Sequence, residues 1–506
     1  MSSTETSNTS HDTLHHITTR QHGLPLLPFP TQDPKDPLRW PRYLKLAALG
    51  ATAFFNFTAN FAGAGFSVAT PVLERQLHRS ASSINNLMTF NFLFLGIGNL
   101  IWVPLGVKYG NRASLLLSMT MLFAVLIWTA KETTYSGLLA ARCLSGFASA
   151  AGESIVPSIV ADIFFLHERA AMMSGYTILI SGATAIGPLC ASFIVEYSRG
   201  GWVDFIWVCA ALAGANIVAI YLLYPESNFT RPNVPVQHVP LPGTQSPGCE
   251  GEKGDMVRVE DASRHYVSVV KKPWMSIWKP SSIFTINRDV SLPKTFVLPL
   301  KMLARPSVLL AVYIYGTSLA SQVILIFAFP SFLLAPPYLF SGSGVGLMQI
   351  AAIIGFIFGC FTGGYLADII TAAIIRRQNG DVYPEQRLLA ILPFSFIAPA
   401  GCILAAFACS LKLHWAAVAV GFGMVSFGTI YAPNIAITYV VESYPKAAAE
   451  CLVSINVFKN LVAFLFLYTA VDWLASSGWL QVYMIMFMLV TLGMIASVMF
   501  YICRHK

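Results

Sequence analysis

One carboxylate stands out because it lies in the middle of a long apolar stretch. Glu153 has small or apolar residues on both sides. Ionisable residues inside membrane spans are costly, and they usually serve a function. Burial favours the neutral form of a carboxylate, so Glu153 could take and release a proton or neutralise a cationic substrate. A structural hydrogen bond to a neighbouring helix is the alternative.

Other polar side chains share these apolar stretches. Arg142 precedes Glu153 by about three helical turns, so both lie on one helix face. An arginine there needs a partner or a wet cavity, unless it reaches the membrane interface instead. Four amides also fall inside expected spans, namely Asn56, Asn60, Asn91 and Asn434. One such amide usually indicates bonding between helices, whereas four together suggest a polar cavity.

The elements that must position these side chains are long and apolar. Of the 506 residues, 55% are hydrophobic and 11% are charged, and the mean hydropathy is +0.62. A soluble domain carries about 25% charged residues, so most of this chain is expected to lie in lipid. A span needs about 20 apolar residues. The stretches that qualify are 44–70, 84–107, 112–131, 135–161, 168–195, 203–224, 306–334, 345–370, 387–410, 413–441, 451–475 and 479–503.

A segment rich in proline, glycine and charge separates the first six stretches from the last six. The predicted divisions are a tail at 1–43, a six-helix half at 44–224, a linker at 225–305, a second half at 306–503 and a short end at 504–506. The linker is expected to be mostly disordered, and its sequence KKPWMSIWKP either lies on the inner membrane surface or is plain linker. Lys and Arg concentrate in alternate connecting segments, so the positive-inside rule places both termini and the linker in the cytosol.

Two sets of six spans joined by a long loop are typical of transporters with a site near the midplane. The predicted fold is an all-α membrane protein with twelve transmembrane helices in two pseudo-symmetric six-helix halves. We expect no enzyme, cofactor or metal site, because we find no GxxxxGK[ST] motif in the linker and no nucleophile–base pair or metal cluster. The net charge of +8 is explained by topology rather than by nucleic acid. The expected partners are a small-molecule substrate, protons and the lipid bilayer, and we expect a monomer.

Two connecting segments carry charged motifs. The turn VPLGVKYGNR contains Lys108, Gly110 and Arg112. It fixes topology or takes part in gating, and its cations could meet a helix C-terminus or an acidic partner. The corresponding turn of the second half lies in GGYLADIITAAIIRRQNGDVYPEQRL, with the residues Gly364, Asp368, Arg376 and Arg377. Its carboxylate is either part of an intracellular lock or simply paired with one of the two adjacent arginines.

Small residues and one proline mark the fifth span, GYTILISGATAIGP. The residues are Gly175, Gly182, Gly187 and Pro188. Glycines allow helices to approach closely, and proline kinks a helix. Plain helix packing explains this pattern as well as a transport motif does.

Together these motifs resemble the major facilitator superfamily, and specifically its fungal drug:proton antiporter-like branch near the polyamine and histidinol transporters. The resemblance covers about residues 35–505. It implies gating roles for the two charged turns, export by exchange for the fifth-span motif, and a functional glutamate at Glu153. The sequence departs from the pattern at Val107, where the family has an acid, and at Ala191–Ser192, where it has two glycines. Lys459 and Asn460 match the branch in the eleventh span, where Lys459 either reaches the interface or serves the cavity.

The resulting hypothesis is a secondary transporter that exports a drug, toxin or secondary metabolite by proton antiport. Proton-coupled uptake of an organic cation such as a polyamine is the first alternative. A non-transporting sensor is the second, although such proteins generally carry a long signalling tail and this chain ends shortly after the last span. The resemblance also implies the plasma membrane.

Overall fold

The computed structural model describes residues 36–229, 292–377, 383–444 and 447–505, together with four two-residue strands. Strand β1 (His16–Ile17) pairs antiparallel with β4 (Val267–Ser268), and β2 (Arg20–Gln21) pairs with β3 (Leu24–Pro25). The other described elements are helical. The sequence KKPWMSIWKP lies outside the described residues.

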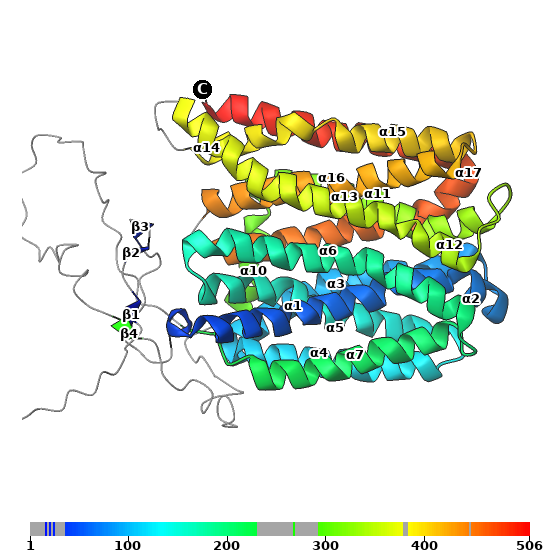
Figure 1. Ribbon diagram of the computed structural model, residues 1–506, viewed down its shortest axis with the longest axis horizontal. Helices are drawn as coiled ribbons and strands as arrows, with labels where there is room; N and C mark the ends of the chain where they lie inside the picture. The colour runs from blue at the N-terminus through cyan, green and yellow to red at the C-terminus, as the bar shows by residue number, and fades with distance from the viewer. Residues whose placement is uncertain are drawn as a thin grey trace, which may run out of the picture.

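The N-terminal half contains six long helices. A short 3-10 helix, η1 (Pro37–Arg39), precedes them, and η2 (Phe66–Ala69) and α2 (Thr70–Leu77) follow the first. The long helices are α1 (Arg42–Gly65), α3 (Ala81–Tyr109), α4 (Asn111–Lys131), α5 (Tyr135–Ile163), α6 (Leu166–Tyr197) and α7 (Trp202–Leu223). They lie roughly along the long axis of the molecule (Figure 1).

The C-terminal half repeats this plan with more interruptions. Its elements are α11 (Pro306–Leu334), α12 (Gly342–Leu347), α13 (Gln349–Phe361), the π-helical turn η4 (Thr362–Leu366), α14 (Ala367–Arg377), the 3-10 helix η5 (Pro384–Phe394), α15 (Ile397–Ser410), α16 (Trp415–Ser443) and α17 (Ala448–His505). Segments α12 to α14 form one span, and η5 with α15 forms another. Helix α17 contains two, because Gly478 has a φ of +73° that breaks the helical conformation.

The described helices therefore supply twelve crossings. Ten stretches are long and apolar enough to span a bilayer, and one of these, Ala448–Cys503, contains two consecutive helices. Dividing that stretch at Gly478 and adding the 24-residue α1 gives the predicted twelve. The all-α fold predicted from the apolar stretches is thus confirmed.

The predicted linker contains a helix that the sequence did not suggest. Helix α10 (Leu292–Met302) lies within 225–305 and contacts both α17 and α3. The Ser454 hydroxyl of α17 donates a hydrogen bond to the Pro299 carbonyl of α10. This part of the linker therefore packs against one helix from each half.

The two halves meet along two pairs of helices. Helix α3 packs against the first part of α17, and α6 packs against α12 and α13. Small residues permit this approach, because a Cβ on Gly96 would lie 3.2 Å from the Val457 carbonyl oxygen. The polar side chains of interest lie along the α3–α17 contact.

Candidate functional site

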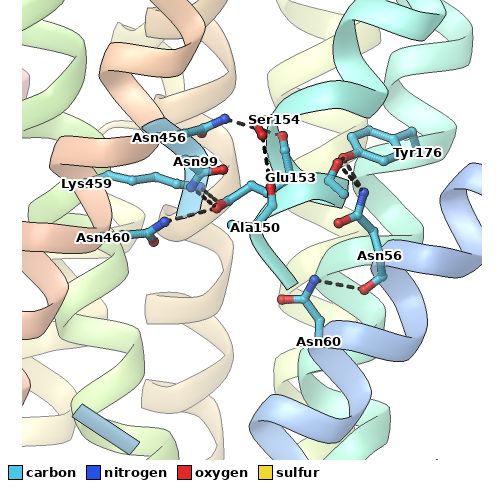
Figure 2. Close-up of polar contacts among 11 residues, drawn as sticks. Asn56, Asn60, Asn99, Ala150, Glu153, Ser154, Tyr176, Asn456, Lys459 and Asn460 are labelled. Carbon is cyan, nitrogen blue, oxygen red and sulfur yellow. Dashed lines mark hydrogen bonds and ion pairs between the residues drawn. The ribbon is translucent and has the colours of Figure 1, made fainter. Parts of the chain in front are cut away.

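Glu153 lies on α5 where the two halves meet (Figure 2). Its Oε1 is 2.5 Å from Nζ of Lys459, which projects from α17 in the opposite half. Its Oε2 accepts hydrogen bonds from Asn99 Nδ2 of α3 at 2.8 Å and from Asn460 Nδ2 of α17 at 3.0 Å. Both carboxylate oxygens are therefore occupied, and donors from both halves hold them.

Lys459 is a buried partner of this carboxylate. The residue is only 5% exposed, and its ammonium lies 4.1 Å from the ring centroid of Tyr315 on α11. The alternative that it reaches the membrane interface is therefore wrong for this structure. The flexible stem places the ammonium between a carboxylate and an aromatic face, both of which stabilise a cation.

The opposite side of α5 is held by α1 and α6. Asn56 Nδ2 donates to the Gly152 carbonyl oxygen at 2.8 Å and to the Tyr176 hydroxyl at 2.7 Å. A Cβ on Gly152 would lie 2.3 Å from the Phe55 ring, so α1 and α5 approach closely only because glycine stands there. These contacts fix the backbone that carries Glu153, and Asn456 Nδ2 adds a bond to the Glu153 carbonyl oxygen at 3.4 Å.

The other predicted amides lie outside the carboxylate cluster. Asn60 Nδ2 donates to the Asn56 carbonyl oxygen one turn earlier in α1, at 2.9 Å. Asn91 Nδ2 donates to the Arg142 carbonyl oxygen, also at 2.9 Å. Asn434 is half-buried on α16, and its carbonyl accepts the Thr438 hydroxyl. Of the four predicted amides, Asn56 is therefore the one whose side chain supports the backbone beside Glu153.

Arg142 is buried, with 3% exposure, but it does not contact Glu153. Its Nη2 donates to the Gly63 carbonyl oxygen at 3.2 Å, and its guanidinium lies 4.6 Å from the Phe66 ring centroid. It has no carboxylate partner in the part of the chain that the structure describes. A backbone carbonyl and an aromatic face thus take the place of an acidic partner.

The charged turn of the N-terminal half is organised around a carboxylate outside the predicted motif. Gly110 has a φ of +102°, which suits glycine, and it connects α3 to α4. The backbone N–H groups of Asn111 and Arg112 donate to Glu226, which follows α7, at 3.1 and 3.0 Å. Arg112 is fully buried and its Nη2 donates to the Tyr221 carbonyl oxygen at 2.7 Å, while Lys108 lies over the Tyr109 ring. These described contacts therefore join the N-terminal half to the first residues of the predicted linker and do not reach the C-terminal half.

The charged turn of the C-terminal half forms a triad. Arg387 of η5 pairs with Asp368 of α14 and with Glu442 near the end of α16. Asp368 thus pairs with Arg387, whereas its expected pairing with Arg376 or Arg377 involves side chains outside the described residues. Gly364 lies in the π-helical turn η4, directly before α14. Both adjacent arginines, Arg376 and Arg377, lie in α14, but their side chains are outside the described part of the structure.

The fifth-span glycines of α6 have different surroundings. A Cβ on Gly187 would lie 2.5 Å from the Phe61 carbonyl oxygen, so this glycine permits contact with α1. Among the described residues, a Cβ on Gly175 would have no heavy atom within 4 Å, and one on Gly182 would meet Ile186 alone, at 3.8 Å. Pro188 lies inside α6 next to Gly187. Helix packing therefore explains Gly187 and does not explain the other two glycines.

Contacts between the halves also occur at the end of the bundle that carries α2 and α12, away from the start of α1 (Figure 1). Ser82 Oγ donates to Asp472 Oδ2 at 3.1 Å, and Asn85 Nδ2 donates to the Leu467 carbonyl oxygen at 2.8 Å. The Ser343 N–H donates to the Glu196 carboxylate across the other helix pair. The halves are therefore joined by hydrogen bonds at this end. Glu153 lies further along the bundle from this end, beside Asn99 of α3.

A groove of about 410 Å³ lies away from this cluster. It runs between α15 and the end of α17, with Phe396, Phe487 and Met494 among its mainly apolar lining residues. None of the predicted site residues lines it. The polar cluster around Glu153 is the better candidate, because it combines buried charge with contacts from both halves.

The sequence did not indicate that Asn99 binds Glu153, and it left the role of Lys459 open. Asn99 is one of several amides in apolar spans, and its fully buried position resembles that of many structural amides. Lys459 lies near enough to the end of its span for its stem to reach the interface. Charge balance could have linked Lys459 to Glu153. A buried carboxylate requires a compensating cation, and few lysines lie inside the expected spans.

The comparisons with known proteins agree with this architecture. The sequence profile described as Major Facilitator Superfamily matches residues 49–467. "Protein HOL1" of Saccharomyces cerevisiae is 25% identical, with 90% of this chain and 85% of that protein covered, and "MFS transporter cpaT" of Aspergillus oryzae is 23% identical, with 85% and 81% covered. The crystal structure of the human organic anion transporter MFSD10 (TETRAN) aligns with a TM-score of 0.56 at 13% identity, covering 90% of this chain and 99% of that one. This last likeness concerns the fold alone.

Proposed function

Since this chain belongs to the major facilitator superfamily and is an integral membrane transporter of a small substrate, we propose that it exports an organic compound in exchange for protons. The compound is a drug, toxin or secondary metabolite. Glu153 carries the proton, and the transporter belongs to the drug:proton antiporter-like branch near the polyamine and histidinol transporters. It works as a monomer in the plasma membrane with both termini in the cytosol.

The observation that carries this proposal is the position of Glu153 between the halves. Its carboxylate is bonded to Asn99 of its own half and to Lys459 and Asn460 of the other. In alternating access the halves rock about a central site. A titratable group bonded to both halves changes the energy of their contact when it gains or loses a proton. Such a group can therefore couple proton movement to the conformational cycle.

Protonation of Glu153 removes the charge that balances Lys459. Leaving a buried charge unpaired costs about 3–5 kcal/mol. The protonated state therefore favours separation of α5 from α17, which lets water or substrate reach the ammonium. Loss of the proton restores the ion pair and the closed contact. The proton thus shifts the balance between two conformations, as coupling requires.

Two further features support exchange and outward transport. The glycines Gly175 and Gly182 of α6 are not needed for close packing, which leaves the fifth-span motif available for substrate passage or helix movement. The hydrogen bonds Ser82–Asp472 and Ser343–Glu196 join the halves at one end. If both termini are cytosolic, that end is the outer one, and these hydrogen bonds close the outer side of the contact between the halves.

One observation favours a second candidate function. The Glu153 carboxylate and the Tyr315 ring together surround an ammonium group. A site of this kind also suits proton-coupled uptake of an organic cation such as a polyamine. The two functions differ in the direction of net transport, whereas both require Glu153.

Transport into sealed proteoliposomes tests the proposal. An imposed pH gradient is combined with a panel of cationic and neutral compounds, and wild type is compared with Glu153→Gln. Glu450→Gln is the matched control, because that carboxylate lies in the first turn of α17, away from the cluster. We expect gradient-driven accumulation in wild type and the control and its loss in Glu153→Gln. Equal accumulation in all three proteins would assign Glu153 a structural role and overturn the proposal.

A further inference from the structure

The groups around the Lys459 ammonium form a site that suits any primary ammonium. Glu153 Oε1 provides the counter-charge at 2.5 Å, and the Tyr315 ring lies 4.1 Å from Nζ. A carboxylate combined with an aromatic face is an arrangement that binds cations strongly once water is excluded. The occupant of this site is a side chain of the transporter itself.

The carboxylate is oriented independently of the ammonium. Asn99 and Asn460 both donate to Oε2, and neither donates to Oε1. The backbone of Glu153 is held separately by Asn456, and Asn56 holds the adjacent Gly152. The position of Oε1 therefore does not depend on Lys459, and another ammonium would find the same oxygen in the same place.

Lys459 can also leave. Lysine carries a compact ammonium on a flexible four-carbon stem, and it is not fixed in a bidentate fork as arginine is. In α17 the Cα–Cβ bonds tilt toward the helix N-terminus, which is the end that begins at Ala448. A withdrawn Lys459 would thus lean toward the end of the bundle opposite to the Ser82–Asp472 contact.

We propose that Glu153 Oε1 and the Tyr315 ring form an ammonium subsite that Lys459 occupies when no substrate is bound. An organic compound with a primary ammonium enters by displacing Lys459. The lysine is a resident competitor that lowers the apparent affinity for substrate and keeps the empty site electrically balanced. This inference rests on the proposed function, since it takes Glu153 to be part of the transport site.

Equilibrium binding separates this inference from proton coupling, because it needs no gradient. Purified protein is titrated by calorimetry with hexylamine and, as the neutral counterpart, with 1-hexanol. The variants are Lys459→Met and, as a matched control, Lys131→Met, which removes an exposed lysine at the end of α4. Thermal unfolding of each variant checks that it is folded.

We expect Lys459→Met to bind hexylamine about tenfold more tightly than wild type, which is the effect of freeing a site that is accessible a tenth of the time. Lys131→Met and the alcohol titrations should show no change. Unchanged or weaker amine binding by folded Lys459→Met would overturn the inference, even if gradient-driven transport still depends on Glu153. Conversely, tighter amine binding with no gradient dependence would keep the subsite and reject proton coupling.

A second variant covers the case in which Lys459→Met does not fold. Lys459→Arg keeps a cation beside Glu153, but the guanidinium can pair with the carboxylate through two hydrogen bonds and is displaced less easily. We expect it to bind hexylamine several-fold more weakly than wild type. Binding equal to that of wild type would contradict a competition between this side chain and the ligand.

Discussion

Glu153 of α5 and Lys459 of α17 form a buried ion pair across the boundary between the two halves, with 2.5 Å between Oε1 and Nζ. They are 306 positions apart in the chain. The pair lies among amides that bind only the other carboxylate oxygen. Because a buried ion pair is balanced only while both partners are charged, its state depends on proton occupancy and on the distance between the halves.

The first prediction concerns the stability of this pair. Glu153→Gln and Lys459→Met should each lower the free energy of unfolding by about 3 kcal/mol, because each leaves one buried charge without its partner. The double variant should lose much less than the sum. Denaturant unfolding in detergent micelles gives the three values for a double-mutant cycle. Additive losses would show that the two side chains do not interact.

Only part of this pair could be predicted from sequence. Glu153 is conspicuous as a charge in an apolar stretch, whereas the same stretch gives no indication of its partner. Lys459 lies where its stem could reach the interface, and helical periodicity relates residues a few positions apart, not residues of different halves. Asn99 could not be distinguished from Asn91 for the same reason.

Crossing segments were easier to predict than their irregularities. Twelve apolar stretches follow from the length that lipid requires. The π-helical turn at Thr362–Leu366 and the helix α10 depend on tertiary contacts, such as that between Ser454 and Pro299. Val107 stands where the family has an acid, and the carboxylate that this turn contacts comes instead from Glu226, far along the chain.

The second prediction distinguishes two glycines of α6. Gly187→Ala should destabilise the protein by about 1–3 kcal/mol, because its Cβ would lie 2.5 Å from a backbone oxygen of α1 and overpacking there moves the helices apart. Gly175→Ala should be neutral or slightly stabilising, since the space is open and alanine favours helix. Thermal unfolding compares them. Equal losses would mean that α1 and α6 do not touch at Gly187.

The third prediction concerns movement at the end that is joined by Ser82 and Asp472. A Ser82→Cys, Asp472→Cys double variant should form a disulfide under oxidation and stop transport, because the crosslink prevents the halves from separating. Reduction should restore transport. As a control, Ser198→Cys with Asp204→Cys crosslinks residues of one half, and should leave transport intact. Full transport by the oxidised first variant would contradict rocking at this end.

The fourth prediction concerns the pH dependence of stability at Glu226. Burial raises the pKa of Glu226 in the folded state, although N–H groups of Asn228, Arg112 and Asn111 partly oppose this. A raised folded-state pKa means that the folded protein holds the proton more tightly than the unfolded chain. This group therefore contributes stability at low pH, and the contribution is lost as pH rises from the ordinary value of 4.5 through the folded-state value.

Unfolding measured between pH 4 and pH 7 tests this directly. Glu226→Gln should lose less stability than wild type over that rise in pH, because glutamine does not titrate. A wild type and variant with parallel pH profiles would show that the Glu226 carboxylate titrates alike in both states.

The fifth prediction concerns the triad of the C-terminal half. Arg387→Ala leaves Asp368 and Glu442 without the cation between them, so we expect a loss of about 1 kcal/mol in unfolding free energy, limited by the exposure of both acids. Arg387→Lys should lose less. A triple variant that also removes the carboxylates of Asp368 and Glu442 should regain the lost stability. If it does not, repulsion between the two acids is not the cause of the loss.

The central claim is that protons act on transport through Glu153. The most direct measurement compares two activities of the same proteoliposomes: exchange of labelled for unlabelled substrate at equal concentrations, and accumulation driven by a pH gradient. We predict that Glu153→Gln still exchanges substrate once the substrate concentration is raised to offset the lost carboxylate contact, while gradient-driven accumulation falls to the level of protein-free vesicles. The same ratio of gradient-driven accumulation to exchange in Glu153→Gln as in wild type would contradict this claim.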